Sequence, residues 1–168
     1  PFMKKKKIKN VLEIGFNTGH SADIFLSNNE KINLISFDIG LHDYVKIGKE
    51  YIDKEYKNRH KLILGDSTRT IPEFINANTD NLKFDLIYID GGHEYNIAKQ
   101  DLINCNRLAH KNSLVILDDV VRNKNNIKFW NEGPNKSWDE CKEFNIIHET
   151  GQIDYNIGRG IAYGKYII

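Results

Sequence analysis

Three carboxylates that follow apolar runs of the chain could form a metal site. Asp90 lies in the run YIDGGH (88–93), and Asp118 and Asp119 follow the run VIL (115–117). If both runs are neighbouring strands of a parallel sheet, their ends bring the three side chains together. Carboxylates this close repel one another unless a cation lies among them, and hard oxygen ligands suit Mg²⁺ or a similar divalent ion. The pattern therefore predicts a metal site. In the alternative, Asp118 caps a turn and Asp119 faces solvent.

A turn with two glycines follows the first apolar run of the chain. The segment EIGFNTGHS (13–21) would let backbone approach a ligand closely and present the N–H groups of a helix start. It lacks the middle glycine of G-x-G-x-x-G and the lysine of a P-loop, which disfavours a pyrophosphate or nucleoside triphosphate site. The turn therefore predicts a ligand without phosphates.

Acidic and hydroxyl side chains follow the next two apolar runs. Asp38 ends ISFD (35–38), and Asp66 and Ser67 lie in GDS (65–67). An acid at the end of the second strand can accept both hydroxyls of a ribose, and the GDS run could hydrogen-bond an adenine edge. Helix capping is the alternative role for these side chains. Together the runs predict an adenosine-type ligand.

The elements that must position these residues alternate along the chain. Short apolar or β-branched runs predict strands at Asn10–Ile14, Leu34–Asp38, Lys61–Leu64, Phe84–Asp90 and Ser113–Asp118. Helical spacing predicts helices at Ser21–Ser27, Asp43–Tyr56, Ile71–Asn76 and Tyr95–Leu108. Such regular alternation favours an α/β fold in which helices cover both faces of a mostly parallel sheet.

The last part of the chain departs from this alternation. After a polar stretch (Arg122–Asn135) and a short helix expected near Trp138–Phe144, two strand-like runs follow without a helix between them, Ile146–Ile153 and Gly160–Ile168. We expect them to pair as an antiparallel hairpin.

Length and composition fit one globular domain over residues 1–168, since domains usually run about 100–200 residues. The net charge of +1 gives no reason to expect nucleic acid or an anionic membrane as a partner, and the run Lys4–Lys7 is expected to be a solvated end. Cys105 and Cys141 are widely separated, which disfavours a disulfide scaffold and a structural zinc site. This use of cysteine favours a reducing, cytoplasmic location. No run approaches the roughly 18 apolar residues of a membrane span, so a soluble protein is expected.

Taken together, these motifs are recognisable. The series E-x-G-x-x-x-G-x-S, an acid after the second strand, G-D-S, D-G-G-H and L-D-D resembles the class I S-adenosylmethionine-dependent methyltransferases. More narrowly, it is similar to the metal-dependent O-methyltransferases that include catechol and macrolide-sugar enzymes. The resemblance runs from Asn10 to Asp119 by motif and to Ile168 by strand order. It implies a Rossmann-like seven-stranded sheet that ends in the antiparallel hairpin.

The resemblance also assigns roles to the matching residues. It implies S-adenosylmethionine as cofactor, a Mg²⁺-like ion on Asp90, Asp118 and Asp119, and His93 as general base beside Asp90. Histidine suits this role because its ordinary pKa, about 6.5, lies near neutral pH. The residues implied for the cofactor are Glu13, Gly15, Phe16, Asn17, Gly19, Ser21, Asp38, Asp66, Ser67 and Asp90. In the alternative for His93, it begins a helix without a catalytic role, and His20 or His42 could line the cleft instead.

The acceptor is expected to be a small molecule or glycan, with a sugar hydroxyl favoured. Catechol enzymes usually carry asparagine where this chain has Asp119, and the sugar enzymes commonly use histidine as base. Trp130 and Trp138 could pack against a sugar face, although tryptophans more often serve packing. The short segment before Asn10 predicts an open site, or one completed by a second subunit or by the rest of a longer polypeptide.

Three other functions stay open at this point. A phenolic acceptor would suit the same metal site. A cofactor-binding module without activity would keep the core motifs. A nicotinamide-dependent oxidoreductase would explain Asp38 and the glycine turn, but it leaves Asp90, Asp118 and Asp119 without a role.

Overall fold

The computed structural model describes residues 8–168, so the run Lys4–Lys7 lies outside the described residues. Its strands are β1 (Asn10–Ile14), β2 (Asn33–Asp38), β3 (His60–Leu64), β4 (Phe84–Ile89), β5 (Ala109–Asp118), β6 (Ile147–Asn156) and β7 (Arg159–Tyr166). Its helices are α2 (His20–Asn28), α3 (Asp43–Glu55), α4 (Ser67–Ala77), α5 (Tyr95–Asn106) and α6 (Glu132–Glu143), with a short 3₁₀ turn η1 (Lys124–Asn126).

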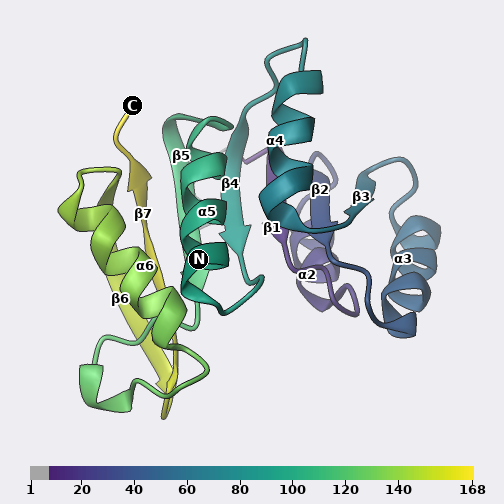
Figure 1. Cartoon of the computed structure of the whole chain (residues 1–168). Helices are drawn as coiled ribbons and strands as arrows, with labels where there is room; N and C mark the ends of the chain where they lie inside the picture. Colours follow the sequence, from purple (N-terminus) through teal and green to yellow (C-terminus); the bar gives the residue numbers. More distant parts are fainter. Residues whose placement is uncertain (1–7) are drawn as a thin grey trace.

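The strands form one seven-stranded sheet in the order β3-β2-β1-β4-β5-β7-β6 (Figure 1). The first five are parallel to one another, while β7 pairs antiparallel with both β5 and β6. This arrangement confirms the predicted α/β fold with a C-terminal antiparallel hairpin. The strand order reverses between β1 and β4, which is where open α/β sheets place their ligands.

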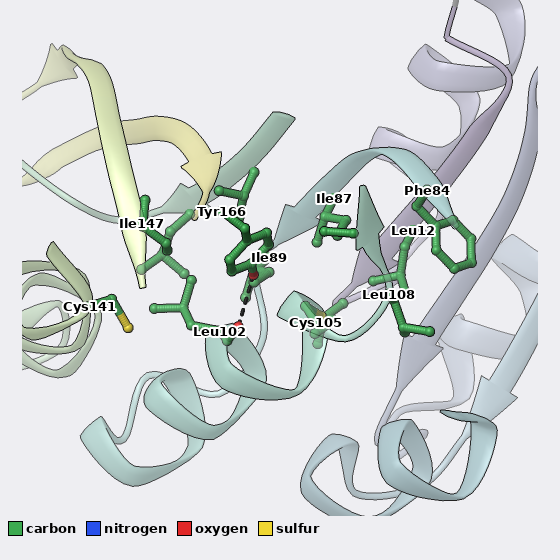
Figure 2. Packing of buried hydrophobic residues seen from close by; sticks show 14 of the residues in the cluster. Leu12, Phe84, Ile87, Ile89, Leu102, Cys105, Leu108, Cys141, Ile147 and Tyr166 are labelled. Atoms are coloured by element: carbon green, nitrogen blue, oxygen red, sulfur yellow. Dashed lines mark hydrogen bonds between the residues drawn. The ribbon is translucent and has the colours of Figure 1, made fainter. Parts of the chain in front are cut away.

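Helices cover both faces of the sheet. On one face α4, α5 and α6 contribute Ile71, Leu102 and Trp138 to a core under the strands, and on the other α2 and α3 contribute Phe25 and Ile52. Figure 2 shows the first core, in which the Tyr166 hydroxyl also donates to the backbone oxygen of Leu102 at 2.9 Å. Each fully buried Leu or Ile side chain contributes about 1.5–3 kcal/mol, so the two cores hold the strand ends in place.

Two predicted helices begin at least four residues earlier than expected. Helix α4 begins at Ser67 rather than Ile71, because the Asp66 side chain accepts the Thr68 N–H at 2.9 Å and so caps the first turn. Helix α6 begins at Glu132, within the polar stretch Arg122–Asn135 and before the helix expected near Trp138–Phe144. Pro134 lies in the first turn of α6, where a missing N–H costs no intrahelical bond.

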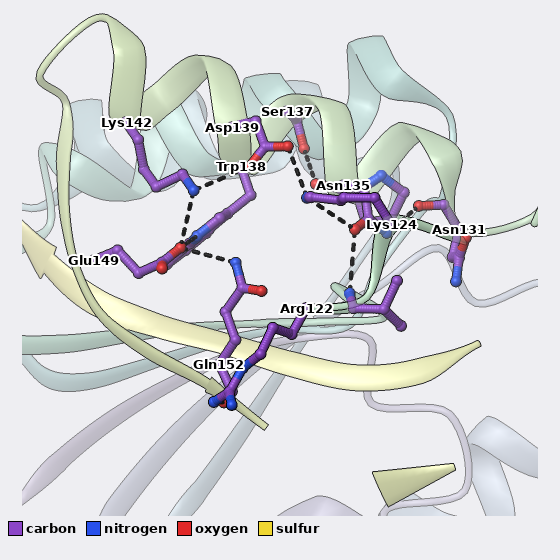
Figure 3. A network of polar contacts seen from close by, with 12 residues as sticks. Arg122, Lys124, Asn131, Asn135, Ser137, Trp138, Asp139, Lys142, Glu149 and Gln152 are labelled. Atoms are coloured by element: carbon purple, nitrogen blue, oxygen red, sulfur yellow. Dashed lines mark hydrogen bonds and ion pairs between the residues drawn. The ribbon is translucent and has the colours of Figure 1, made fainter. Parts of the chain in front are cut away.

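The loops around α6 are held by polar side chains. Figure 3 shows Trp138, whose indole N–H donates to Glu149 at 2.7 Å, and Asn135, which accepts the backbone N–H of Val121 at 3.1 Å. The amide nitrogen of Asn135 donates to the backbone oxygen of Asp119 at 3.0 Å. Asn135 therefore fixes the chain directly after β5, where the site residues lie.

Candidate active site

A pocket of about 420 Å³ opens beyond the carboxyl ends of β1, β2, β3 and β4. It lies at the edge of the sheet where the sequence predicts a cofactor. Its lining consists of residues from the strand ends and the segments that follow them, namely Ile14, Gly15, Asn17, Phe37, Asp38, Ile39, His42, Tyr44, Val45, Gly65, Asp66, Ser67, Asp90, Gly91, Gly92, Glu94 and Ile97. Six of the ten residues predicted for the cofactor are in this wall: Gly15, Asn17, Asp38, Asp66, Ser67 and Asp90.

The turn after β1 packs directly against the end of β4. Gly15 has φ +94°, and a Cβ atom there would lie 1.9 Å from the backbone oxygen of Asp90. The Gly15 N–H donates to the backbone oxygen of Phe37 at 2.8 Å. Only glycine combines this conformation with this approach, so the turn leaves backbone rather than a side chain at the pocket wall.

Asp38 is held in the pocket wall by two backbone N–H groups. Its carboxylate accepts from Asn17 and from Gly40, each at 2.8 Å. It does not cap α3, whose N-cap residue is His42. Each carboxylate oxygen can accept a second hydrogen bond, so Asp38 is free to bind hydroxyls of a ligand.

Asp66 combines capping with a place in the pocket. One carboxylate oxygen caps α4, and its hydrogen bonds with Thr68 lower the pKa of Asp66. Asp66 and Ser67 both line the pocket. Capping and ligand contact, which the sequence presents as alternatives, are therefore compatible here.

Four predicted cofactor residues lie outside the pocket wall: Glu13, Phe16, Gly19 and Ser21. Glu13 is fully buried and accepts hydrogen bonds from the hydroxyls of Ser21 and, at 2.6 Å, Ser36. Burial raises the pKa of Glu13 to about 7. Phe16 is buried and stacks on His60 with ring centroids 5.0 Å apart. Phe16 and Gly19 pack against each other within the turn, since a Cβ atom on Gly19 would lie 2.9 Å from the Phe16 ring.

Next to the pocket, Asp90, His93 and Asp119 come together. Each offers a ligand atom, and these atoms lie within 4.8 Å of one another. The Nε2 atom of His93 lies 3.1 Å from Oδ2 of Asp119. The side chain of Asp119 is 2% exposed, and its backbone adopts φ +58°. This left-handed residue turns the chain at the end of β5, so that Asp118 and Asp119 face different partners.

Asp118 accepts hydrogen bonds from two tyrosine hydroxyls rather than joining this group of three. Tyr88 of β4 and Tyr155 of β6 both lie 3.2 Å from its carboxylate. Burial is the main reason that the pKa of each tyrosine is raised, and the charge of Asp118 adds to it. The predicted ligand Asp118 is thus near the cluster but engaged elsewhere.

The acidic groups affect one another's protonation. Although Asp90 is open to the pocket, surrounding protein atoms and the charges of Asp118 and Asp119 raise its pKa to about 7. Burial and Asp118 also raise the pKa of Asp119, while Arg159 and His93 act against this rise. The cluster is an environment that favours a cation.

Arg159, at the start of β7, supplies such a cation, and no motif in the sequence pointed to it. Its Nη1 atom lies 3.1 Å from Oδ1 of Asp119, and its guanidinium lies over the ring of Trp130 at 4.2 Å. Trp130 also approaches His93, with ring centroids 6.2 Å apart. The other tryptophan, Trp138, is fully buried and packs in the core, so it is not available to an acceptor.

Comparison with known proteins identifies the class. A family model described as a methyltransferase domain matches residues 12–120, and the chain belongs to this family. The motif series between Asn10 and Asp119 is thus confirmed as that of a class I S-adenosylmethionine-dependent methyltransferase. None of the curated proteins matches the chain.

Solved structures with similar folds belong to the same class. The O-methyltransferase TomG from Streptomyces achromogenes, in complex with SAM, has a TM-score of 0.78 at 15% identity, over 99% of this chain and 77% of TomG. The O-methyltransferase from Bacillus cereus, in complex with SAH, has a TM-score of 0.75 at 18% identity, over 94% of this chain and 74% of that one. The SAH-bound methyltransferase PaMTH1 from Podospora anserina has a TM-score of 0.72 at 19% identity, over 99% of this chain and 75% of PaMTH1. At these identities the likeness shows the fold.

Within residues 8–168, no helix is long and apolar enough to cross a bilayer.

Proposed function

We propose that the protein transfers a methyl group from S-adenosylmethionine to a hydroxyl of a small molecule or glycan. The observation that carries this proposal is the position of Asp90. It lines the pocket at the switch in strand order and is also a member of the cluster with His93 and Asp119. One end of a ligand in the pocket would therefore lie near His93, the candidate base.

Three parts of the pocket suit three parts of the cofactor. Asp38 accepts the ribose hydroxyls, the wall at Asp66 and Ser67 receives the adenine, and the Gly15 turn with Asp90 surrounds the methionine end. S-adenosylmethionine supplies a methyl group activated by a sulfonium. The negative charge of Asp90 favours that positive centre over the neutral product, and the apolar residues Phe37, Val45 and Ile97 exclude water around the rest.

His93 is the proposed base for the acceptor hydroxyl. With Nε2 donating to Asp119, Nδ1 is the ring nitrogen that can accept a proton. Asp119 orients the imidazole and stabilises the positive charge that forms when the proton is taken. General base catalysis of this kind contributes about 10²–10⁴-fold to a rate.

The same side chains have the chemistry of a divalent metal site. Two carboxylates and an imidazole within 4.8 Å fit a Mg²⁺- or Mn²⁺-like ion, which Asp90 and Asp119 would hold with His93 in reach. Bound there, such an ion would stabilise negative charge on the acceptor oxygen. Asp118 is not part of this group of three, so the proposed ligand set differs from the three aspartates expected from the sequence.

A sugar hydroxyl is the proposed acceptor group. Its support is the acid at position 119, histidine as base, and the ring of Trp130 beside His93. A phenolic acceptor is the second candidate, because two aromatic side chains near the site are exposed. Phe129 precedes Trp130 in the chain and is 91% exposed. Tyr155 donates a hydrogen bond to Asp118 and is 58% exposed. Such faces suit a flat aromatic ring.

Calorimetry with S-adenosylmethionine, S-adenosylhomocysteine and NAD tests the cofactor. We expect binding of the first two and none of NAD; failure to bind either adenosyl ligand would refute the proposal. A methyl-transfer assay on a panel of glycosides and catechols, with and without a chelator, then tests acceptor and metal. Transfer to glycosides that stops on chelation is expected, and cofactor binding without transfer to any hydroxyl would favour a silent binding module.

A further inference from the structure

The guanidinium of Arg159 occupies the cation position of the acidic cluster. Its Nη1 atom contacts both carboxylate oxygens of Asp119, at 3.1 Å to Oδ1 and 3.4 Å to Oδ2. Oδ2 also faces Nε2 of His93 at 3.1 Å. Both oxygens of a carboxylate that is 2% exposed are thus already engaged by side chains that can carry positive charge.

Arg159 is held in this position by the hairpin between β6 and β7. The preceding residue, Gly158, has φ +72°, and its backbone oxygen accepts from the buried amide of Asn131 at 2.8 Å. The following residue, Gly160, accepts from the backbone N–H of Val120 at 3.2 Å, directly after Asp119. These bonds anchor the chain on both sides of Arg159 to the segments around the site.

Trp130 holds the guanidinium itself. The ring lies 4.2 Å from the centre of the guanidinium, a separation at which the negative face of an indole attracts a cation. A stacked guanidinium loses little further freedom on binding a carboxylate. Half of the Arg159 side chain nevertheless stays exposed, so it is free to swing away into solvent.

We propose that Arg159 is the resident cation of this cluster and that a divalent metal ion binds only by displacing it from Asp119. This inference rests on the proposed metal site. A metal ion would lie about 2.0–2.2 Å from an Asp119 oxygen. The Arg159 guanidinium lies 3.1 Å from the same carboxylate, so the two cations would be within a few ångströms of each other. Their repulsion makes the two cations alternatives.

The exchange gives Arg159 a defined effect on metal affinity. Without metal, the guanidinium compensates the buried charge of Asp119 and keeps the site folded. Metal binding must break a charge-assisted hydrogen bond, a loss that lowers apparent affinity by about tenfold or more. Arg159 would therefore restrict the site to conditions in which metal is abundant.

Titration of the full chain with Mn²⁺ alone, by calorimetry and by electron paramagnetic resonance, tests the exchange without an activity assay. Arg159→Gln removes the cation, and Arg159→Met does so while keeping an apolar stem over Trp130. Arg159→Lys keeps the charge. Lys165→Gln, an exposed position on β7 six residues further on, removes the same charge about 20 Å away along the strand.

We expect Mn²⁺ to bind Arg159→Gln and Arg159→Met about tenfold or more tightly than the unaltered chain. Arg159→Lys should stay within about threefold of the unaltered chain, and Lys165→Gln within about twofold. Equal or weaker binding by folded Arg159→Gln and Arg159→Met would overturn the proposal, as would an equal gain in Lys165→Gln or no Mn²⁺ binding by any variant. Thermal unfolding identifies variants that have lost their fold. S-adenosylmethionine binding, measured in the same samples, reports separately on the proposed function.

Discussion

The backbone oxygen of Asp90 stands 1.9 Å from the position where a Cβ atom on Gly15 would lie. The turn after β1 and the end of β4 therefore approach each other through backbone atoms at this point. This contact joins the cofactor side of the pocket to the segment that carries Asp90 and His93. Any side chain at position 15 would separate the two.

Gly15→Ala should consequently lower both stability and cofactor affinity. Its methyl group meets rigid backbone, and φ +94° is strained for alanine, so we expect a loss of about 2–4 kcal/mol in the free energy of unfolding. Urea denaturation measures it. Gly40→Ala is the control, because Gly40 also has positive φ but its nearest neighbour is the flexible side chain of Leu64. Equal stability of the two variants would contradict the proposed contact.

Asp38→Asn should weaken S-adenosylmethionine binding by about 10–100-fold, the value of a hydrogen bond to a charged group. The substitution keeps the shape of the side chain but leaves one acceptor oxygen for Asn17, Gly40 and the ribose. Calorimetry gives the dissociation constant. Asp53→Asn, on the surface of α3 beside Lys49, removes the same charge outside the pocket and should bind normally. Unchanged affinity of Asp38→Asn for S-adenosylmethionine would show that Asp38 does not bind the ribose.

His93→Gln should lower the methyl-transfer rate by about 10²–10⁴-fold while the affinity for S-adenosylmethionine changes little. The reason is that His93 approaches Asp119 but is absent from the pocket wall. Initial rates at saturating cofactor and a binding titration separate the two effects. His148→Gln, an exposed histidine on β6, serves as the control. A rate equal to that of the unaltered protein would exclude His93 as the base.

Glu13→Gln should flatten the dependence of stability on pH. Burial raises the pKa of Glu13 from 4.5 to about 7, so the folded protein holds this proton where the unfolded chain has lost it. Between about pH 4.5 and 7 the unfolded state binds fewer protons, and the free energy of unfolding falls as pH rises, by up to roughly 3 kcal/mol from this residue. Glutamine does not titrate and can still accept from one serine hydroxyl.

Chemical denaturation at pH 4.5, 6 and 7.5 checks this expectation. The fall in the free energy of unfolding with rising pH should be smaller in Glu13→Gln. It should not vanish, because burial also raises the pKa of Asp101 to about 7. Glu50→Gln is a suitable control on the exposed side of α3. An unchanged slope in Glu13→Gln would show that Glu13 is ionised in the folded protein.

Much of the fold could be predicted because its signals are local. The strand Asn10–Ile14 was predicted and occurs with the same ends, because Val11, Leu12 and Ile14 are apolar residues that the sheet buries. The start of α4 was missed because it depends on the Asp66 cap, for which an acid before a helix is only a weak signal. The start of α6 was missed because glycine and proline at 133 and 134 also suit a turn.

The sequence by itself determined which residues stand after each strand, and therefore that Asp38, Asp66 and Asp90 meet in one pocket. Only the tertiary structure decided which partners the adjacent side chains of Asp118 and Asp119 contact. The positive φ of Asp119 sends it toward His93 while Asp118 turns to Tyr88 and Tyr155. It also brought Arg159 to Asp119 across forty residues. Strand ends follow from hydrophobic pattern, whereas the partner of a charge depends on chain direction and on distant hairpins that no local pattern encodes.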